Sequence, residues 1–162
     1  MKKKTVLIHS NFTRAFTGFG KNKKNIMRYL YDTGKYNLIE LANGIEWEAP
    51  STKLLPWTCR GSLPKPQEMQ GLTPEQQREQ GYGSKLVDRA IKEFKPDVYI
   101  GMEDIWAFNG YHTKPWWNKV NTMVWTTLDS LPILPQAIEY APKIKNYYVW
   151  ASFAEKAMNE LG

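Results

Sequence analysis

Three carboxylates follow two apolar segments of the sequence. Glu103 and Asp104 come directly after the run at 98–102, and Asp129 lies shortly after the run at 121–126. A carboxylate can accept a proton from a hydroxyl nucleophile or hydrogen-bond to the hydroxyl groups of a bound molecule. Short acidic side chains also cap turns, and for each residue alone the two interpretations are about equal. Because the carboxyl ends of parallel strands meet at one edge of a sheet, we treat the three together as candidate catalytic residues.

A second group of candidates lies in the loop after the first apolar run. This loop contains Asn11 and the sequence Gly18-Phe19-Gly20, and a helical pattern follows it. Glycines allow a ligand to approach the backbone, and a helix N-terminus offers free N–H groups to anions. These four residues are therefore candidate binding residues. The G-x-G spacing lacks the third glycine of the dinucleotide fingerprint, so an NAD or FAD site is not expected.

Aromatic and histidine residues add one further binding candidate and no metal site. Trp106 follows the acidic pair in the same loop, where its face can stack on a bound ring. Seven tryptophans in one chain more often indicate packing of the core and its rim. His9 and His112 lack the spacing of metal ligands, and His9 ends an apolar run, which favours a buried structural histidine.

Composition indicates an ordinary globular domain. The 162 residues are 42% hydrophobic and 23% charged, which favours neither a disordered nor a membrane protein. No apolar stretch approaches the ~18 to 20 residues of a transmembrane helix, and the N-terminus does not resemble a secretory signal. The one cysteine, Cys59, cannot form an intramolecular disulfide, which agrees with a reducing compartment. A cytoplasmic location is the expectation.

The formal net charge of +6 points to an anionic partner of some kind. Nucleic acid, anionic lipid and a phosphorylated small molecule all fit the charge. The lysines form no arginine-rich helix and no aromatic RNA-binding pattern, so nucleic acid is not expected. A solvated basic surface is the commoner explanation for such lysine clusters.

Apolar runs alternate with helical patterns along the chain, as in parallel α/β proteins. Strands are expected at 5–9, 36–42, 98–102, 121–126 and 146–150, and helices at 21–31, 75–94 and 153–161. The segment 44–72 is rich in proline and has no helical period, so it is expected to form an insertion that is either a short hairpin, at 45–48 and 53–59, or irregular. The predicted fold class is α/β, an open doubly wound and mostly parallel sheet of about five strands with helices on both faces.

Several segments together resemble a known family. They are the long glycine loop, the strand 98–102 with the acidic pair behind it, the sequence Trp125-Thr-Thr-Leu-Asp-Ser-Leu-Pro132, and the sequence Tyr148-Val-Trp-Ala-Ser-Phe-Ala154. They are similar to the N-terminal, Rossmann-like domain of GT-B glycosyltransferases of the retaining, glycogen-synthase-like class. In that family a D-g-x-P turn follows the fourth strand, and an S-x-f-a/g element opens a later helix. Ser130 and Leu128 depart from the family, which often has glycine and histidine there.

The resemblance implies a sugar transfer from a nucleotide-sugar donor to a carbohydrate or lipid-linked acceptor. Residues 1–162 would form one domain that supplies the acceptor side of the cleft, with Glu103, Asp104 and Asp129 orienting acceptor hydroxyls. A C-terminal domain, not included in this sequence, would hold the nucleotide, so this piece alone is expected to transfer sugar poorly. The family needs neither a metal nor a further cofactor. The basic charge is also compatible with peripheral contact at a membrane surface.

Two other function classes remain open on sequence grounds. One is a non-catalytic module that binds a nucleotide or sugar at the glycine loop without a second domain. The other is a basic nucleic-acid-binding domain, whose affinity would fall steeply with salt. Fold alone does not decide among these classes.

Overall fold

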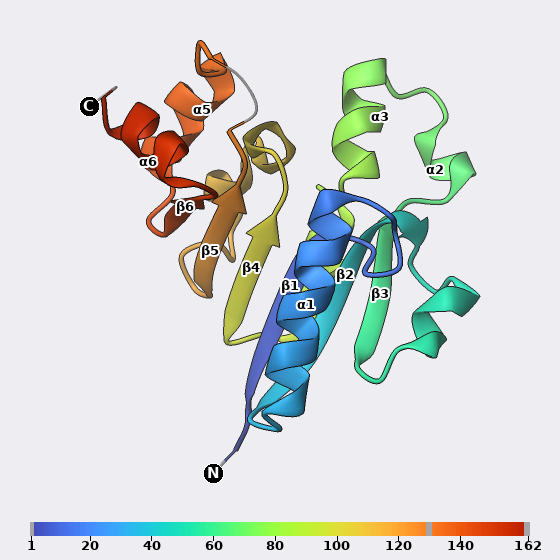
Figure 1. Cartoon of the computed structure of the whole chain (residues 1–162). Helices are drawn as coiled ribbons and strands as arrows, with labels where there is room; N and C mark the ends of the chain where they lie inside the picture. Colours follow the sequence, from blue (N-terminus) through green and yellow to red (C-terminus); the bar gives the residue numbers. More distant parts are fainter. Residues whose placement is uncertain (1, 129–130, 161–162) are drawn as a thin grey trace.

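The computed structural model describes residues 2–128 and 131–160. Within them the chain forms one six-stranded sheet in the order β3-β2-β1-β4-β5-β6, and all neighbouring strands are parallel (Figure 1). The strands are β1 (Lys4–Asn11), β2 (Tyr36–Glu46), β3 (Thr58–Leu63), β4 (Val98–Met102), β5 (Asn121–Thr126) and β6 (Tyr147–Val149). The predicted doubly wound α/β fold is thus confirmed, and it is Rossmann-like. Strand order reverses between β1 and β4, which places a topological switch point at the centre of the sheet.

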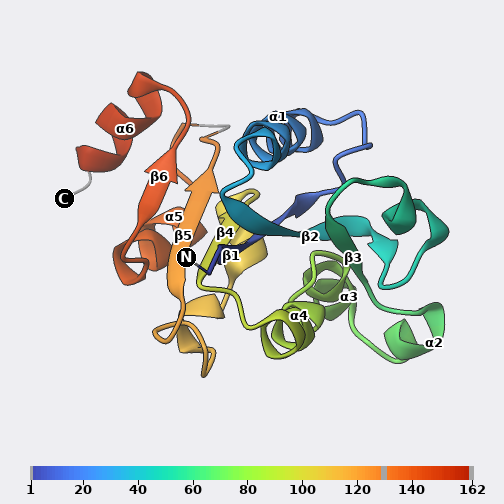
Figure 2. The ribbon, with the colours of Figure 1, turned by 90° about the horizontal axis from the view of Figure 1, so that it is seen from below.

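Helices cover both faces of this sheet, as Figure 2 shows. The α-helices are α1 (Gly18–Asp32), α2 (Pro66–Met69), α3 (Pro74–Gly81), α4 (Leu86–Phe94), α5 (Pro135–Tyr140) and α6 (Ser152–Asn159). Short 3₁₀ helices are η1 (Pro50–Leu54), η2 (Ile105–Phe108), η3 (Tyr111–Thr113) and η4 (Ala141–Lys143). Helix α1 packs on one face, and α4 with the η2 and η3 turns packs on the other (Figure 2).

The alternation of side chains in β1 explains why this strand lies at the centre. Val6 and Ile8 belong to the cluster beneath α1, together with Met27 of that helix. Leu7 points the opposite way and joins Val87 of α4 in the larger cluster. A strand that is apolar on both faces is buried by helices on both sides, which is the pattern of a central parallel strand.

The segment 44–72 corrects one sequence-based expectation. In place of a hairpin, Thr58–Leu63 forms β3, which pairs in parallel with β2 as an edge strand of the sheet. Gly61 makes this pairing feasible, because a Cβ at that position would collide with the backbone of Ile45 and Glu46. Such a close approach between distant backbones leaves no periodic signal in the sequence. The expected five strands therefore become six.

The expected helix at 75–94 is two helices. Helix α3 ends at Gly81 and α4 begins at Leu86, and Gly83 between them has φ +83°. That left-handed conformation is easily adopted only by glycine. The break lets the end of α3 turn onto the sheet edge, where the backbone of Gly83 lies against His9 and Ser62.

Candidate functional site

The candidate site lies at the switch point, where the carboxyl ends of β1 and β4 diverge. The loop after β1 leads into α1, and Glu103 with Asp104 follows β4 directly. Ser10 pairs with Met102 in the last register position between the two strands. In open α/β sheets, ligands bind in the crevice beyond these strand ends.

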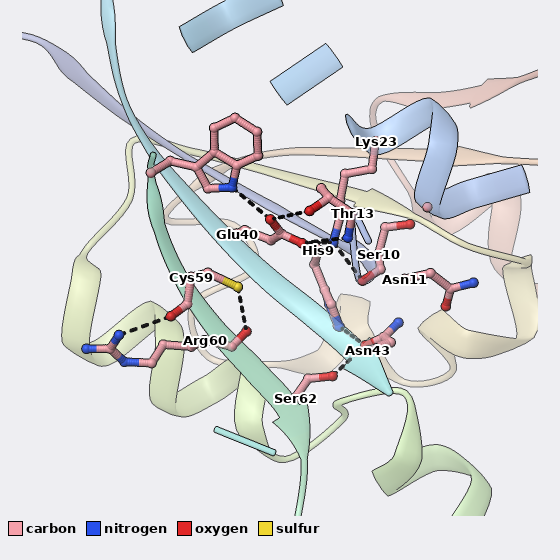
Figure 3. Close-up of polar contacts among 12 residues, drawn as sticks. His9, Ser10, Asn11, Thr13, Lys23, Glu40, Asn43, Cys59, Arg60 and Ser62 are labelled. Atoms are coloured by element: carbon pink, nitrogen blue, oxygen red, sulfur yellow. Dashed lines mark hydrogen bonds and ion pairs between the residues drawn. The ribbon is translucent and has the colours of Figure 1, made fainter. Parts of the chain in front are cut away.

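A chain of buried hydrogen bonds ends on Glu103. Asn43, in β2, donates from Nδ2 to Glu103 Oε1 over 3.0 Å. The Oδ1 atom of the same amide accepts from His9 Nε2 at 2.8 Å and from the hydroxyl of Ser62 (Figure 3). Since His9 Nε2 must then carry its proton, His9 Nδ1 accepts from the Tyr99 hydroxyl at 2.9 Å. Four strands are thereby joined through side chains alone.

Burial perturbs both ionisable ends of this chain. It raises the pKa of Glu103 to about 7, and Asp104 acts in the same direction, whereas the hydrogen bond from Asn43 and the charge of Lys23 oppose the shift. Burial lowers the pKa of His9 to about 3, so the imidazole is neutral near physiological pH. Glu103 can therefore exchange a proton near neutrality, which is a property of many acid–base sites.

The opposite face of the sheet carries a buried ion pair. Lys23 of α1 and Glu40 of β2 are both fully buried, with Nζ and Oε1 2.9 Å apart. Lys23 Nζ also donates to the Ser10 carbonyl oxygen at 3.0 Å, and Glu40 accepts the Thr13 backbone N–H at 3.0 Å and Trp57 Nε1 at 2.7 Å (Figure 3). These bonds hold the end of β1 and the start of its loop in one position.

The predicted binding residues of the loop have different surroundings. Asn11 donates to Thr17 Oγ1 over 3.0 Å, and that oxygen in turn accepts the Gly20 N–H at the start of α1. A Cβ on Gly20 would lie 2.8 Å from two backbone oxygens, so this glycine is needed for packing. Gly18 is exposed with open space around it. The Phe19 ring packs against that of Trp150, with the ring centroids 5.4 Å apart.

The predicted catalytic residues are placed unequally. Glu103 is only 3% exposed. Asp104 is half-buried at the carboxyl end of β4 and accepts a hydrogen bond from Thr127 Oγ1 at 2.9 Å. Asp129 lies outside the described residues. Trp106 is half-buried at the rim, with its ring 4.7 Å from that of Tyr82. The structure thus brings the carboxyl ends of β1 and β4 together, and it exposes Asp104 to solvent more than Glu103.

Sequence reasoning missed several residues around Glu103: Asn43, which donates to it, Ser62, which donates to Asn43, and Tyr82, whose phenol lies within its field. Asn43 directly follows the expected strand at 36–42, so the rule that strand ends share one edge would have identified it. Ser62 lies in β3, which was not expected as a strand, and Tyr82 lies at the unexpected helix break. The buried position of Lys23 had no sequence signal, because lysines at helix starts are usually solvated.

In residues 2–128 and 131–160, no three His, Cys, Asp or Glu side chains come together in a way that could hold a metal ion. No helix in these ranges has both the length and the apolar character needed to cross a bilayer. Comparisons with protein-family models and with curated proteins found no match for the chain.

Proposed function

We propose that this domain forms the acceptor side of a nucleotide-sugar-dependent glycosyltransferase of the GT-B type. The observation that carries the proposal is the adjacent pair of carboxylates at the switch point, one buried with a pKa of about 7 and one half-buried. The family-like motifs after β5 and before α6, together with the parallel six-stranded sheet, support the same proposal.

Glu103 and Asp104 have different roles in this proposal. Asp104 orients an acceptor hydroxyl and accepts its hydrogen bond, because its side chain is half-buried at the carboxyl end of β4. Glu103 positions the strand end behind Asp104 through Asn43. Asp129 is the third proposed carboxylate on the strength of its motif.

The donor enters from the side of the β1 loop. Gly18 is exposed and leaves room for a diphosphate near the start of α1, where Phe19 can contact the sugar or acceptor. A second Rossmann-like domain would bind the nucleotide and complete the cleft. The basic net charge of this domain suits a negatively charged donor, a lipid-linked acceptor and contact with an anionic membrane surface.

A transfer assay tests this function directly. We expect this domain, together with a domain that binds the nucleotide, to transfer sugar from a nucleotide-sugar donor, with donor turnover measured across a panel of UDP-, GDP- and ADP-sugars. Asp104→Asn is expected to lower kcat about a hundredfold, the effect of removing a positioned acid–base group. Asp32→Asn is the matched control, since Asp32 is exposed at the end of α1 and pairs with Arg28.

The outcomes separate the function classes. Transfer that survives unchanged in the Asp104→Asn variant contradicts the proposed role. Saturable nucleotide-sugar binding without any turnover would instead indicate a non-catalytic binding module. Tight binding to nucleic acid that weakens steeply with salt and ignores sugars would indicate the third class.

A further inference from the structure

Helix α3 lies beyond the carboxyl ends of the strands, as Figure 1 shows. Its position is fixed at two places: Asn109 Nδ2 donates to Glu79 Oε1 at 3.0 Å, and the Gly83 turn packs on the buried cluster with no space for a Cβ. Side chains at the end of α3 are therefore held close to the residues that follow β4.

Three side chains pack on one another at this place: Arg78 of α3, Tyr82 directly after that helix, and Trp106 of η2. The Tyr82 and Trp106 rings meet edge to face, with centroids 4.7 Å apart and planes at 79°. The guanidinium of Arg78 lies over the Trp106 ring at 5.1 Å. Trp106 lies in the η2 turn that follows Asp104, so the aromatic pair borders the proposed acceptor carboxylate.

The electrostatics of Tyr82 agree with this placement. Burial raises the pKa of its phenol, and the negative charges of Glu103 and Asp104 raise it further, whereas Arg78 lowers it. The phenol therefore lies within the field of both carboxylates and of the arginine. One rim thus combines two aromatic rings, a carboxylate and a cation.

Arg78 has unused binding capacity. It is exposed, and in the part of the chain that the structure describes no carboxylate lies within ion-pair distance of it, in contrast to Arg28 and Arg60. The contact with Trp106 places the guanidinium at this rim, and a guanidinium can bind a phosphate or carboxylate through two N–H groups.

We propose that Arg78, Tyr82 and Trp106 form a subsite for a carbohydrate acceptor that carries a phosphate or carboxylate group. This inference rests on the proposed function and specifies its acceptor class. The aromatic rings pack against the apolar face of the sugar ring, Asp104 accepts its hydroxyls, and Arg78 binds the anionic group.

Calorimetric titration of the chain tests the subsite. The probes are glucose 6-phosphate, glucuronate, neutral glucose and inorganic phosphate. We expect the two anionic sugars to bind about tenfold more tightly than glucose, as charge-assisted hydrogen bonds predict. Arg78→Gln is expected to abolish that preference, so that the two anionic sugars bind no more tightly than glucose. Arg89→Gln is the matched control, since Arg89 is also exposed and stacks on a tryptophan, Trp47, at 4.2 Å.

Several results would overturn the inference. These are no binding of either anionic sugar, equal binding of charged and neutral sugars, a preference that survives Arg78→Gln, or one that Arg89→Gln removes equally. Inorganic phosphate that binds as tightly as glucose 6-phosphate would reduce the subsite to a simple anion site. Donor turnover tests the glycosyltransferase function separately from this subsite. Sugar transfer without any preference for an anionic acceptor therefore refutes only the subsite.

Discussion

At the residue scale, Glu103 differs from Glu40, the other buried carboxylate among residues 2–128 and 131–160, which pairs with Lys23. The Glu103 side chain is almost fully buried, and it accepts hydrogen bonds from the neutral amides of Asn43 and the Asn11 backbone in place of an ion pair with a cation. Burial without a paired charge favours the protonated acid. The nearby histidine, which is also buried, is neutral for the same reason. Between about pH 3 and about pH 7, Glu103 and His9 are therefore both uncharged.

The titration of Glu103 makes stability depend on pH. Its pKa in the folded chain is about 7 against an ordinary 4.5, so its favourable contribution is complete below about pH 4.5 and is lost as the pH rises through 7. Glu103→Gln keeps the acceptor for Asn43 and removes the titration. We expect this variant to gain roughly 1 to 3 kcal/mol over the wild type between about pH 5 and about pH 8.

Urea denaturation at the two pH values measures that gain. Glu155→Gln, at an exposed position on α6, serves as the control and is expected to change stability by less than about 0.5 kcal/mol. The same difference between Glu103→Gln and wild type at both pH values would contradict the perturbed titration. His9 is present in both proteins, so its own titration cancels in the comparison.

At the element scale, the turn between α3 and α4 determines where the rim of the site lies. This turn places α3 beyond the strand ends and packs against the buried side chains of His9 and Ser62. Both effects depend on Gly83, because its positive φ reverses the chain and its missing Cβ permits the contact with His9 and Ser62. A continuous helix would have directed α3 away from the crevice.

Two glycine substitutions test this turn. Gly83→Ala would place a Cβ 2.8 Å from His9 Nε2 and from Ser62 Cβ, in a strained backbone conformation. We expect a loss of about 2 to 4 kcal/mol in the free energy of unfolding. Gly81→Ala adds a Cβ in open space at the end of α3 and is expected to be neutral or to stabilise by up to about 1 kcal/mol. Equal effects in urea denaturation would show that the turn tolerates a side chain.

At the scale of the whole molecule, stability is concentrated in the middle of the sheet. Strand β1 pairs with two neighbours over most of its length and has helices on both faces. Strand β6 has three residues, pairs only with β5 and is half-buried or exposed. The candidate site lies beside the most strongly packed strands, so it is held in a rigid frame.

Hydrogen exchange measures this gradient. We expect amides of β1 and β4 to exchange near the rate of global unfolding, and those of β6 to exchange at least about tenfold faster through local opening. Mass spectrometry of peptides that cover each strand under native conditions is the measurement. Protection of β6 equal to that of β1 would contradict the inferred distribution of stability.

The sequence alone determined the α/β class, five of the six strands at close to their observed positions, and the edge at which Glu103 and Asp104 lie. Each of these rests on a local signal, namely a run of apolar residues and the polar residues directly behind it. The glycine loop before α1 was visible for the same reason. Whether Asp104 and the loop act on a sugar stays a prediction.

Only the tertiary structure decided which polar groups meet. The hydrogen bonds from His9 to Asn43, from Asn43 to Glu103 and from Tyr99 to His9 join residues 34, 60 and 90 positions apart. Their contacts depend on strand order and register, which no local period encodes. The parallel pairing of β3 and the packing of the α3 turn likewise depend on glycines that allow distant backbones and side chains to approach. The identities of the strands are local properties, whereas the composition of the site is a property of how they are assembled.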